Sequence, residues 1–168
     1  MELVISKIES PLGELVLVAS AGGLCGLWYV DEGEGEAMRV WLDRTYPGAT
    51  VTSRAQPELE APLRAYFAGD LTAIDELKVA PHGTPFQICV WQALRRIPAG
   101  ETWTYARLAK EVGNPSATRA VGAANGRNPI ALVVPCHRVV ASNGRLGGYA
   151  GGLHRKEWLL RHEGAHLA

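Results

Sequence analysis

Residues 135–139 read Pro-Cys-His-Arg-Val and place a thiol directly before an imidazole. They follow an apolar run at residues 130–134, which predicts a buried strand that ends at Pro135. A thiol at the end of a core strand can act as a nucleophile when a neighbouring base takes its proton. The alternative is that Cys136 is a small buried hydrophobic residue, as most free cysteines are.

A cysteine needs a proton acceptor to react near neutral pH, and an imidazole held by a carboxylate can supply one. His137 is adjacent, but neighbouring residues of an extended strand point to opposite faces, so the chain must turn at Cys136 or a water molecule must link the two groups. Glu163 is the preferred orienting acid, because it follows the motif outside the body of a helix. An activated Cys136 would ionise below its ordinary pKa. The other imidazoles are interpreted as surface residues: His154, His162 and His166.

The composition predicts a globular protein without a membrane segment. The chain has 168 residues, of which 47% are hydrophobic and 20% charged, enough for one large domain or two small ones. No apolar run approaches the length of a membrane span, and the N-terminus lacks the layout of a secretion signal, so we expect a cytoplasmic protein. The three cysteines form no CxxC pair and fit a reducing compartment.

Charge is divided unequally between the two halves of the chain. Residues 1–80 hold 6 Lys/Arg against 13 Asp/Glu, and residues 81–168 hold 11 against 4. The second half would therefore attract a polyanion such as nucleic acid. The alternative is that the two halves attract each other within one protein, and charge alone does not decide between them.

Patterning predicts the elements that must position the thiol. The first half predicts strands at residues 2–9, 13–20 and 23–30, helices at 36–45 and 58–68, and a further strand at 74–79, followed by a linker at 81–83. The second half predicts helices at 85–97, 105–112, 117–125 and 153–162, the first three capped by Thr84, Thr104 and Ser116. Cys89 falls on the apolar stripe of the first of these helices, which predicts a core position.

The helices at 105–112 and 117–125 form the outline of a helix-turn-helix. The second helix is built almost entirely of small residues, with Arg119 as its one long side chain. This indicates either tight packing in a core or close approach to a nucleic-acid groove, into which Arg119 would reach. Asn143-Gly144 predicts a hairpin, which after a helix-turn-helix would form a wing. Residues 147–152 are rich in glycine but lack the spacing of a nucleotide-binding loop. They are interpreted as a pliable pocket wall around Tyr149.

Taken together, residues 84–164 resemble the O6-alkylguanine-DNA alkyltransferases, also called methylated-DNA–protein-cysteine methyltransferases. The first half resembles their N-terminal domain more loosely, through residues 65–69. The matching segments are Phe86-Gln87 with Val90-Trp91, residues 97–102, Tyr105, residues 119–122, Asn128-Pro129, residues 135–139 and residues 152–164.

The resemblance implies an α/β (α+β) fold, with a ribonuclease-H-like strand-rich domain at 1–80 and a winged-helix, helix-turn-helix domain at 81–168 that binds DNA. It implies repair by direct reversal, in which Cys136 accepts a methyl or small alkyl group from O6-alkylguanine in a single turnover. His137 would take the thiol proton through a water molecule, Glu163 would hold His137, Tyr105 would donate toward the guanine ring, and Asn128 would brace the turn before the active-site segment.

The implied partner is double-stranded DNA containing alkylated guanine, bound through its minor groove by a monomer. Arg119 would fill the space of the flipped nucleotide. The candidate DNA-contacting residues are Ser116, Thr118, Arg119, Ala120, Ala124 and Arg127, and the candidate pocket residues are Val139, Tyr149, Ala150, Gly151 and Lys156. Many relatives carry serine where this chain has Ala150, which removes a side-chain contact but keeps the main-chain N–H.

No cofactor and no metal is expected, because thiolate attack on an alkyl carbon needs neither, and Cys25 with His82 does not make a four-ligand site. Three other functions stay open: a lesion-binding relative without alkyl transfer, a transcription regulator that uses the helix-turn-helix, and a cysteine hydrolase. The sequence leaves undecided the size of alkyl group accepted, activity on O4-alkylthymine and cooperative binding along DNA.

Overall fold

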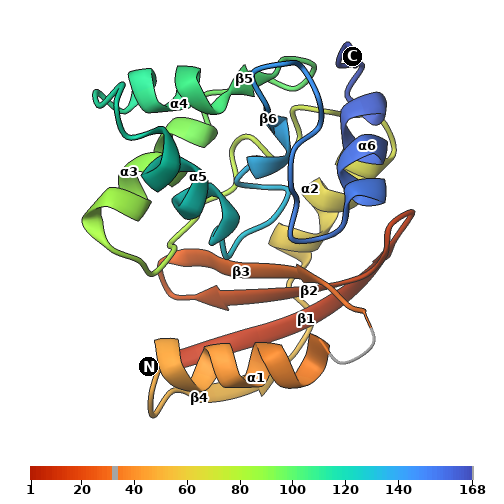
Figure 1. The fold of residues 1–168 in the computed structure, drawn as a ribbon. Helices are drawn as coiled ribbons and strands as arrows, with labels where there is room; N and C mark the ends of the chain where they lie inside the picture. Colours follow the sequence, from red (N-terminus) through yellow and green to blue (C-terminus); the bar gives the residue numbers. More distant parts are fainter. Residues whose placement is uncertain (32–33, 168) are drawn as a thin grey trace. The chain divides into compact units, whose positions relative to one another are not determined.

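The computed structural model describes residues 1–31 and 34–167, and the chain divides into two compact units, Met1–His82 and Gly83–Ala168 (Figure 1). Residues 32, 33 and 168 belong to the predicted domain ranges but lie outside the described residues. Strands and helices are both present in the first unit, and helices dominate the second. The predicted α/β (α+β) class is confirmed.

The first unit is built on a four-stranded sheet in the order β3-β2-β1-β4. Strands β1 (Glu2–Ser10), β2 (Gly13–Ser20) and β3 (Gly23–Tyr29) form an antiparallel meander, and β4 (Thr50–Ser53) pairs parallel with β1. The first turn is tight because Ser10 Oγ donates to the carbonyl of Gly13 at 2.6 Å, with Gly13 at a φ of 100° that glycine adopts without strain.

Helices α1 (Glu34–Thr45) and α2 (Pro57–Phe67) complete this unit. Helix α1 lies along one face of the sheet (Figure 1), and Leu42 on its inner side is buried among apolar side chains of the three meander strands. Alternation along each strand supplies that face, because every second side chain of a strand points to the same side. The buried members of this core are Leu3, Val16, Val18, Cys25 and Leu42.

The structure of the first unit differs from the predictions in two places. Residues 74–79 do not form the predicted strand: they turn, and only Val79 makes an isolated parallel bridge with Leu24, whose N–H donates to the carbonyl of Lys78 at 2.9 Å. Strand β4 was not predicted, because it has only four residues and Val51 is its one apolar side chain, so apolar and polar residues do not alternate along it.

The second unit begins with α3 (Pro85–Leu94), whose start agrees with the predicted cap. Thr84 Oγ1 accepts from the main-chain N–H of Gln87 at 3.2 Å, and the Gln87 side chain accepts from the N–H of Thr84 at 3.0 Å. This reciprocal arrangement is a capping box, which satisfies two N–H groups that the helix cannot. The predicted core position of Cys89 is wrong: its side chain is exposed, because Val90, Trp91 and Ala93 supply the buried stripe instead.

Helices α4 (Tyr105–Glu111) and α5 (Thr118–Gly126) form the predicted helix pair (Figure 1). Thr104 caps α4 as expected, since its Oγ1 accepts from Arg107 N at 3.0 Å. Ser116 does not cap α5; its hydroxyl donates to Asn114 Oδ1 at 3.0 Å, inside the turn, and α5 begins without a side-chain cap. Indole Nε1 of Trp91 donates to the carbonyl of Ala124 at 2.8 Å and ties α5 to α3.

Beyond the helix pair, β5 (Trp103–Thr104) pairs parallel with β6 (Val139–Val140), and α6 (Leu153–His162) ends at the predicted residue. The Asn143-Gly144 turn is present, closed by Ala141 N donating to the carbonyl of Arg145 at 3.0 Å. The rest of the predicted hairpin is absent, since no strand follows this turn in the described part of the chain. None of the described helices is long and apolar enough to cross a membrane.

Candidate active site

The segment that leads to Cys136 is a buried turn, so the predicted strand at 130–134 is wrong. Val134 N donates to the carbonyl of Ile130 at 3.0 Å, Cys136 N donates to that of Val134 at 2.8 Å, and Leu132 has a φ of 71°. These bonds satisfy the main chain locally where a strand would have needed a neighbour. An unbroken apolar run cannot by itself distinguish a strand from such a turn.

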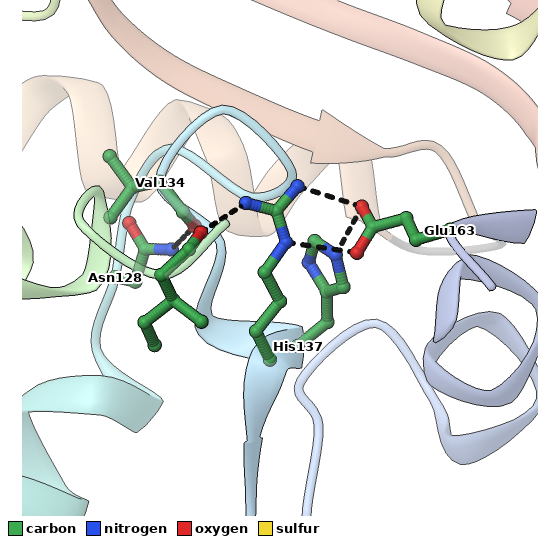
Figure 2. A network of polar contacts seen from close by, with 6 residues as sticks. Asn128, Val134, His137 and Glu163 are labelled. Atoms are coloured by element: carbon green, nitrogen blue, oxygen red, sulfur yellow. Dashed lines mark hydrogen bonds and ion pairs between the residues drawn. The ribbon is translucent and has the colours of Figure 1, made fainter. Parts of the chain in front are cut away.

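Asn128 holds this turn from within (Figure 2). Its Nδ2 donates to the carbonyl of Val134 at 2.7 Å and to that of Ile130 at 3.4 Å, and its Oδ1 accepts from Ile130 N at 3.0 Å. An amide side chain can do both because it carries a donor and an acceptor group. Asn128 is thus the residue that closes the segment on which Cys136 is carried.

Cys136 and His137 lie on a single 3₁₀ turn, η1 (Cys136–Arg138). The chain turns at Cys136, as one of the two predicted possibilities required, because Arg138 N donates to the carbonyl of Pro135 at 3.0 Å. The side chains of the turn are buried: Cys136 is 8% exposed, His137 0% and Arg138 3%. The thiol and the imidazole are therefore not on opposite faces of a strand.

Glu163, at the end of α6, reaches His137 as predicted (Figure 2). Glu163 Oε2 lies 2.9 Å from His137 Nε2. The same carboxylate accepts two bonds from Arg138, Nε to Oε1 and Nη2 to Oε2, each at 2.9 Å. Burial alone would raise the pKa of Glu163, but the bonds and charges of His137 and Arg138 hold that pKa well below its usual range. Glu163 is therefore an anion in this site.

An ionised Glu163 determines which nitrogen of His137 carries the proton. Burial, together with the charges of Arg138 and Lys156, lowers the pKa of His137 below its ordinary value despite the hydrogen bond and charge of Glu163, so the ring is neutral near pH 7. The hydrogen must then be on Nε2, where it bonds to the carboxylate. Nδ1 is buried and has no hydrogen-bond partner in the described part of the chain, so its lone pair is able to accept a proton.

The Cys136 thiol is protonated at rest, contrary to the expectation of a lowered pKa. Burial raises the pKa of Cys136 above its ordinary value, more than the Asn128 hydrogen bond and the charge of Lys156 lower it. Burial also raises the pKa of Tyr105, at the start of α4, and the nearby Cys136 adds to that rise. The site therefore holds a neutral thiol, a neutral imidazole and a neutral phenol until something moves a proton.

Lys156, on α6, connects that helix to β6 and to the glycine-rich loop at residues 147–152. Its ammonium donates to the carbonyl of Val139 at 2.6 Å and to that of Gly148 at 3.1 Å, and it is fully buried. Burial lowers the pKa of Lys156 to about 8, a shift that the neighbouring Cys136 opposes. Lys156 thus ties β6 to the glycine-rich loop. That loop brings Tyr149 to His137, with ring centroids 6.4 Å apart, and leaves Ala150 exposed and Gly151 half-buried.

The predicted DNA-contacting residues lie on α5 or directly beside its two ends, and all but one of them are exposed. Ser116, Thr118, Arg119, Ala120 and Arg127 are exposed. Ala124 is 3% exposed and its carbonyl accepts the Trp91 indole, so its side chain faces the core and does not belong to that surface.

Sequence reasoning missed the part that Arg138 plays. Its guanidinium is buried, and besides its two bonds to Glu163 it donates through Nη1 to the carbonyl of Ile97 at 2.6 Å. The only signal in the sequence was an arginine next to the Cys-His pair in an otherwise apolar stretch. A buried arginine is almost always paired with an acid, so an arginine in this apolar stretch indicated that an acidic partner lies elsewhere in the chain.

Comparison with known proteins identifies the family of this chain. The model of the 6-O-methylguanine DNA methyltransferase DNA-binding domain matches residues 85–165. A methylated-DNA–protein-cysteine methyltransferase of Salmonella typhimurium is 48% identical over 166 residues, covering 98% of this chain and 97% of the relative. One from Methanosarcina acetivorans is 50% identical over 157 residues, covering 94% and 96%.

Solved structures agree over the same length. OGT of Mycobacterium tuberculosis, solved in complex with DNA, has a TM-score of 0.79 and 40% identity and covers 98% of this chain and 93% of that chain. The O6-methylguanine-DNA methyltransferase of Pyrococcus kodakaraensis has a TM-score of 0.73 and 27% identity, covering 97% and 99%. Since the likeness to the Salmonella and Methanosarcina relatives spans both units at about half identity, the chain belongs to the methylated-DNA–protein-cysteine methyltransferase family.

Proposed function

We propose that this chain repairs DNA by direct reversal, transferring a methyl or small alkyl group from O6 of alkylguanine to Sγ of Cys136. The observation that carries the assignment is the buried Cys136–His137 turn, in which an anionic Glu163 fixes the proton on His137 Nε2 and leaves Nδ1 as a base. A thiol of raised pKa needs such a base close by.

The transfer balances without a cofactor. His137 Nδ1, through a water molecule, takes the proton of Cys136, and the resulting thiolate attacks the alkyl carbon. The Sγ–C bond forms as the O6–C bond breaks, and the electron pair stays on O6 of guanine. Tyr105, whose raised pKa keeps its phenol protonated, donates toward the ring as that charge develops. The proton taken from the thiol finally resides on guanine N1, and the thioether has no simple reversal, so each molecule acts once.

The DNA side of the proposal follows from access. An alkyl group on O6 cannot be reached inside a duplex, so the nucleotide must be flipped out, at a cost of a few kcal/mol. Arg119 is exposed on a helix of small side chains and would fill the gap, with α5 in the minor groove. The flipped guanine would lie against Val139, Tyr149, Ala150 and Gly151. We further propose that the protein acts as a monomer in the cytoplasm, where its three free cysteines would stay reduced.

The direct test is intact-mass measurement after mixing with a duplex that contains one O6-methylguanine. The wild-type protein should gain one methyl group in place of a hydrogen, and peptide mapping should place it on Cys136. Cys136→Ser should gain nothing, while Cys89→Ser, which removes the exposed thiol, should behave as wild type. Methylation at any other residue, or none in the wild type, would overturn the assignment.

A further inference from the structure

Arg138 is a buried cation that the transfer mechanism does not use. It is 3% exposed, and all three of its nitrogen atoms are occupied, two by Glu163 and one by the carbonyl of Ile97. The guanidinium is thereby fixed at both ends, on a main-chain carbonyl and on a carboxylate. A two-bond arginine–carboxylate pair is the strongest and most rigid of the ordinary ion pairs.

One carboxylate oxygen is shared between this pair and the proposed base. Glu163 Oε2 accepts from Arg138 Nη2 at 2.9 Å and lies 2.9 Å from His137 Nε2. His137 therefore meets an anion that is already paired with a cation. An opposite charge in contact favours the protonated imidazole and a like charge nearby disfavours it, so the two residues act on His137 in opposite directions.

The charges around His137 make the cost of protonating it depend on where the proton comes from. With neutral His137, the Arg138–Glu163 pair has no net charge. A proton taken from solvent would add one positive charge to a buried site that already holds the Lys156 ammonium, which is costly. A proton taken from Cys136 creates a thiolate at the same time, so the net charge of the site does not change.

We propose that Arg138 is a positioning residue that weakens His137 as a base by pairing with Glu163, so that His137 takes a proton only as Cys136 loses one. The proposal rests on the proposed function of His137 as the acceptor of the thiol proton. Arg138 bonds to neither the thiol nor the imidazole; it acts on His137 both through its pairing with Glu163 and directly through its own positive charge. Removing its charge should make His137 easier to protonate, and should let Cys136 ionise at lower pH.

Other polar groups lie near His137 or Cys136 and are the same in every variant below. They are Lys156 on α6, which bonds to Val139 and Gly148, Tyr149 on the loop, Tyr105 on α4 and Asn128 before the turn. Because these groups do not change, differences between variants at Arg138 and Glu163 isolate the contribution of those two charges.

The test is an NMR titration of the His137 ring, without DNA, in the wild type and in R138M, R138K, E163Q and the double variant R138M/E163Q. R138M should raise the His137 titration midpoint by about one pH unit or more, the size expected for one nearby buried charge. R138K keeps the charge without the two-bond geometry, so its shift should be smaller. E163Q should lower the midpoint, and the double variant should titrate above E163Q.

Iodoacetamide labelling of Cys136 in the same variants gives a second measurement, in which R138M should react at lower pH than wild type. An unchanged His137 midpoint in R138M, or equal shifts in R138K and R138M, would overturn the proposal, because the charge would then have no effect. If R138M does not fold, the comparison of E163Q with R138M/E163Q decides the question. Methyl transfer from DNA is measured separately, so a failure of the repair assignment leaves these titrations interpretable.

Discussion

Removing the Asn128 side chain should clearly destabilise the active-site segment. Asn128→Ala takes away the acceptor of Ile130 N, at 3.0 Å, and a strong bond to the carbonyl of Val134, at 2.7 Å; the 3.4 Å contact with Ile130 contributes little. A buried N–H left without a partner costs about 1–3 kcal/mol, and the Val134 bond adds about 1. We therefore expect a loss of about 2–4 kcal/mol in the free energy of unfolding.

Urea unfolding followed by circular dichroism measures this loss. The matched control is Asn143→Ala, an exposed asparagine whose Oδ1 accepts from Arg145 N at 3.0 Å in a loop of the same unit. Its loss should be below about 1 kcal/mol, because water replaces an exposed bond. The reasoning is refuted if the two variants unfold at the same urea concentration. Asn128→Ala should also slow methyl transfer, because its hydrogen bond lowers the pKa of the Cys136 thiol.

Four further changes test other parts of the second unit. Thr84→Ala removes the capping box of α3 and should cost about 1 kcal/mol in urea unfolding; no change would mean that the cap is not formed in solution. Gly83→Val places a Cβ 2.5 Å from the Trp91 ring, so we expect about 1–3 kcal/mol of destabilisation and altered indole fluorescence, whereas a wild-type spectrum would contradict the packing. Arg119→Ala should slow methyl transfer from duplex DNA about tenfold or more and leave transfer from the free base O6-methylguanine unchanged; equal slowing on both would rule out a role in flipping. The lowered pKa of Glu163 means that its contribution to stability is present above the ordinary glutamate pKa, about 4.3, and is lost as pH falls below it, so Glu163→Gln should show a shallower acid loss of stability than wild type.

Local signals predicted most of the elements. Strand β2 and helix α6 begin and end at the predicted residues, because alternation, helical period and glycine turns are all read from neighbours in the sequence. Strand β4 could not be found in this way. It exists because it pairs in parallel with β1, nearly fifty positions earlier in the chain, and three of its four residues are polar.

The active site also contains features that the sequence predicts and features that depend on contacts between distant residues. Cys136, His137 and Glu163 could be predicted from the motif and from the shortage of acids in the second half, and the structure brings them together. The turn at 130–134 could not, because its decisive bonds come from the Asn128 side chain rather than from a periodic pattern. Arg138 was overlooked because its partner lies 25 positions away and only burial makes the pair matter.

All side chains that the proposed chemistry uses lie on one uninterrupted stretch, from Tyr105 to Glu163, inside the unit Gly83–Ala168. A single crossover in the coding sequence would therefore carry the acceptor, its base and the surrounding ion pairs together into another protein. Substitutions in residues 1–82 change none of the side chains that the proposed chemistry uses.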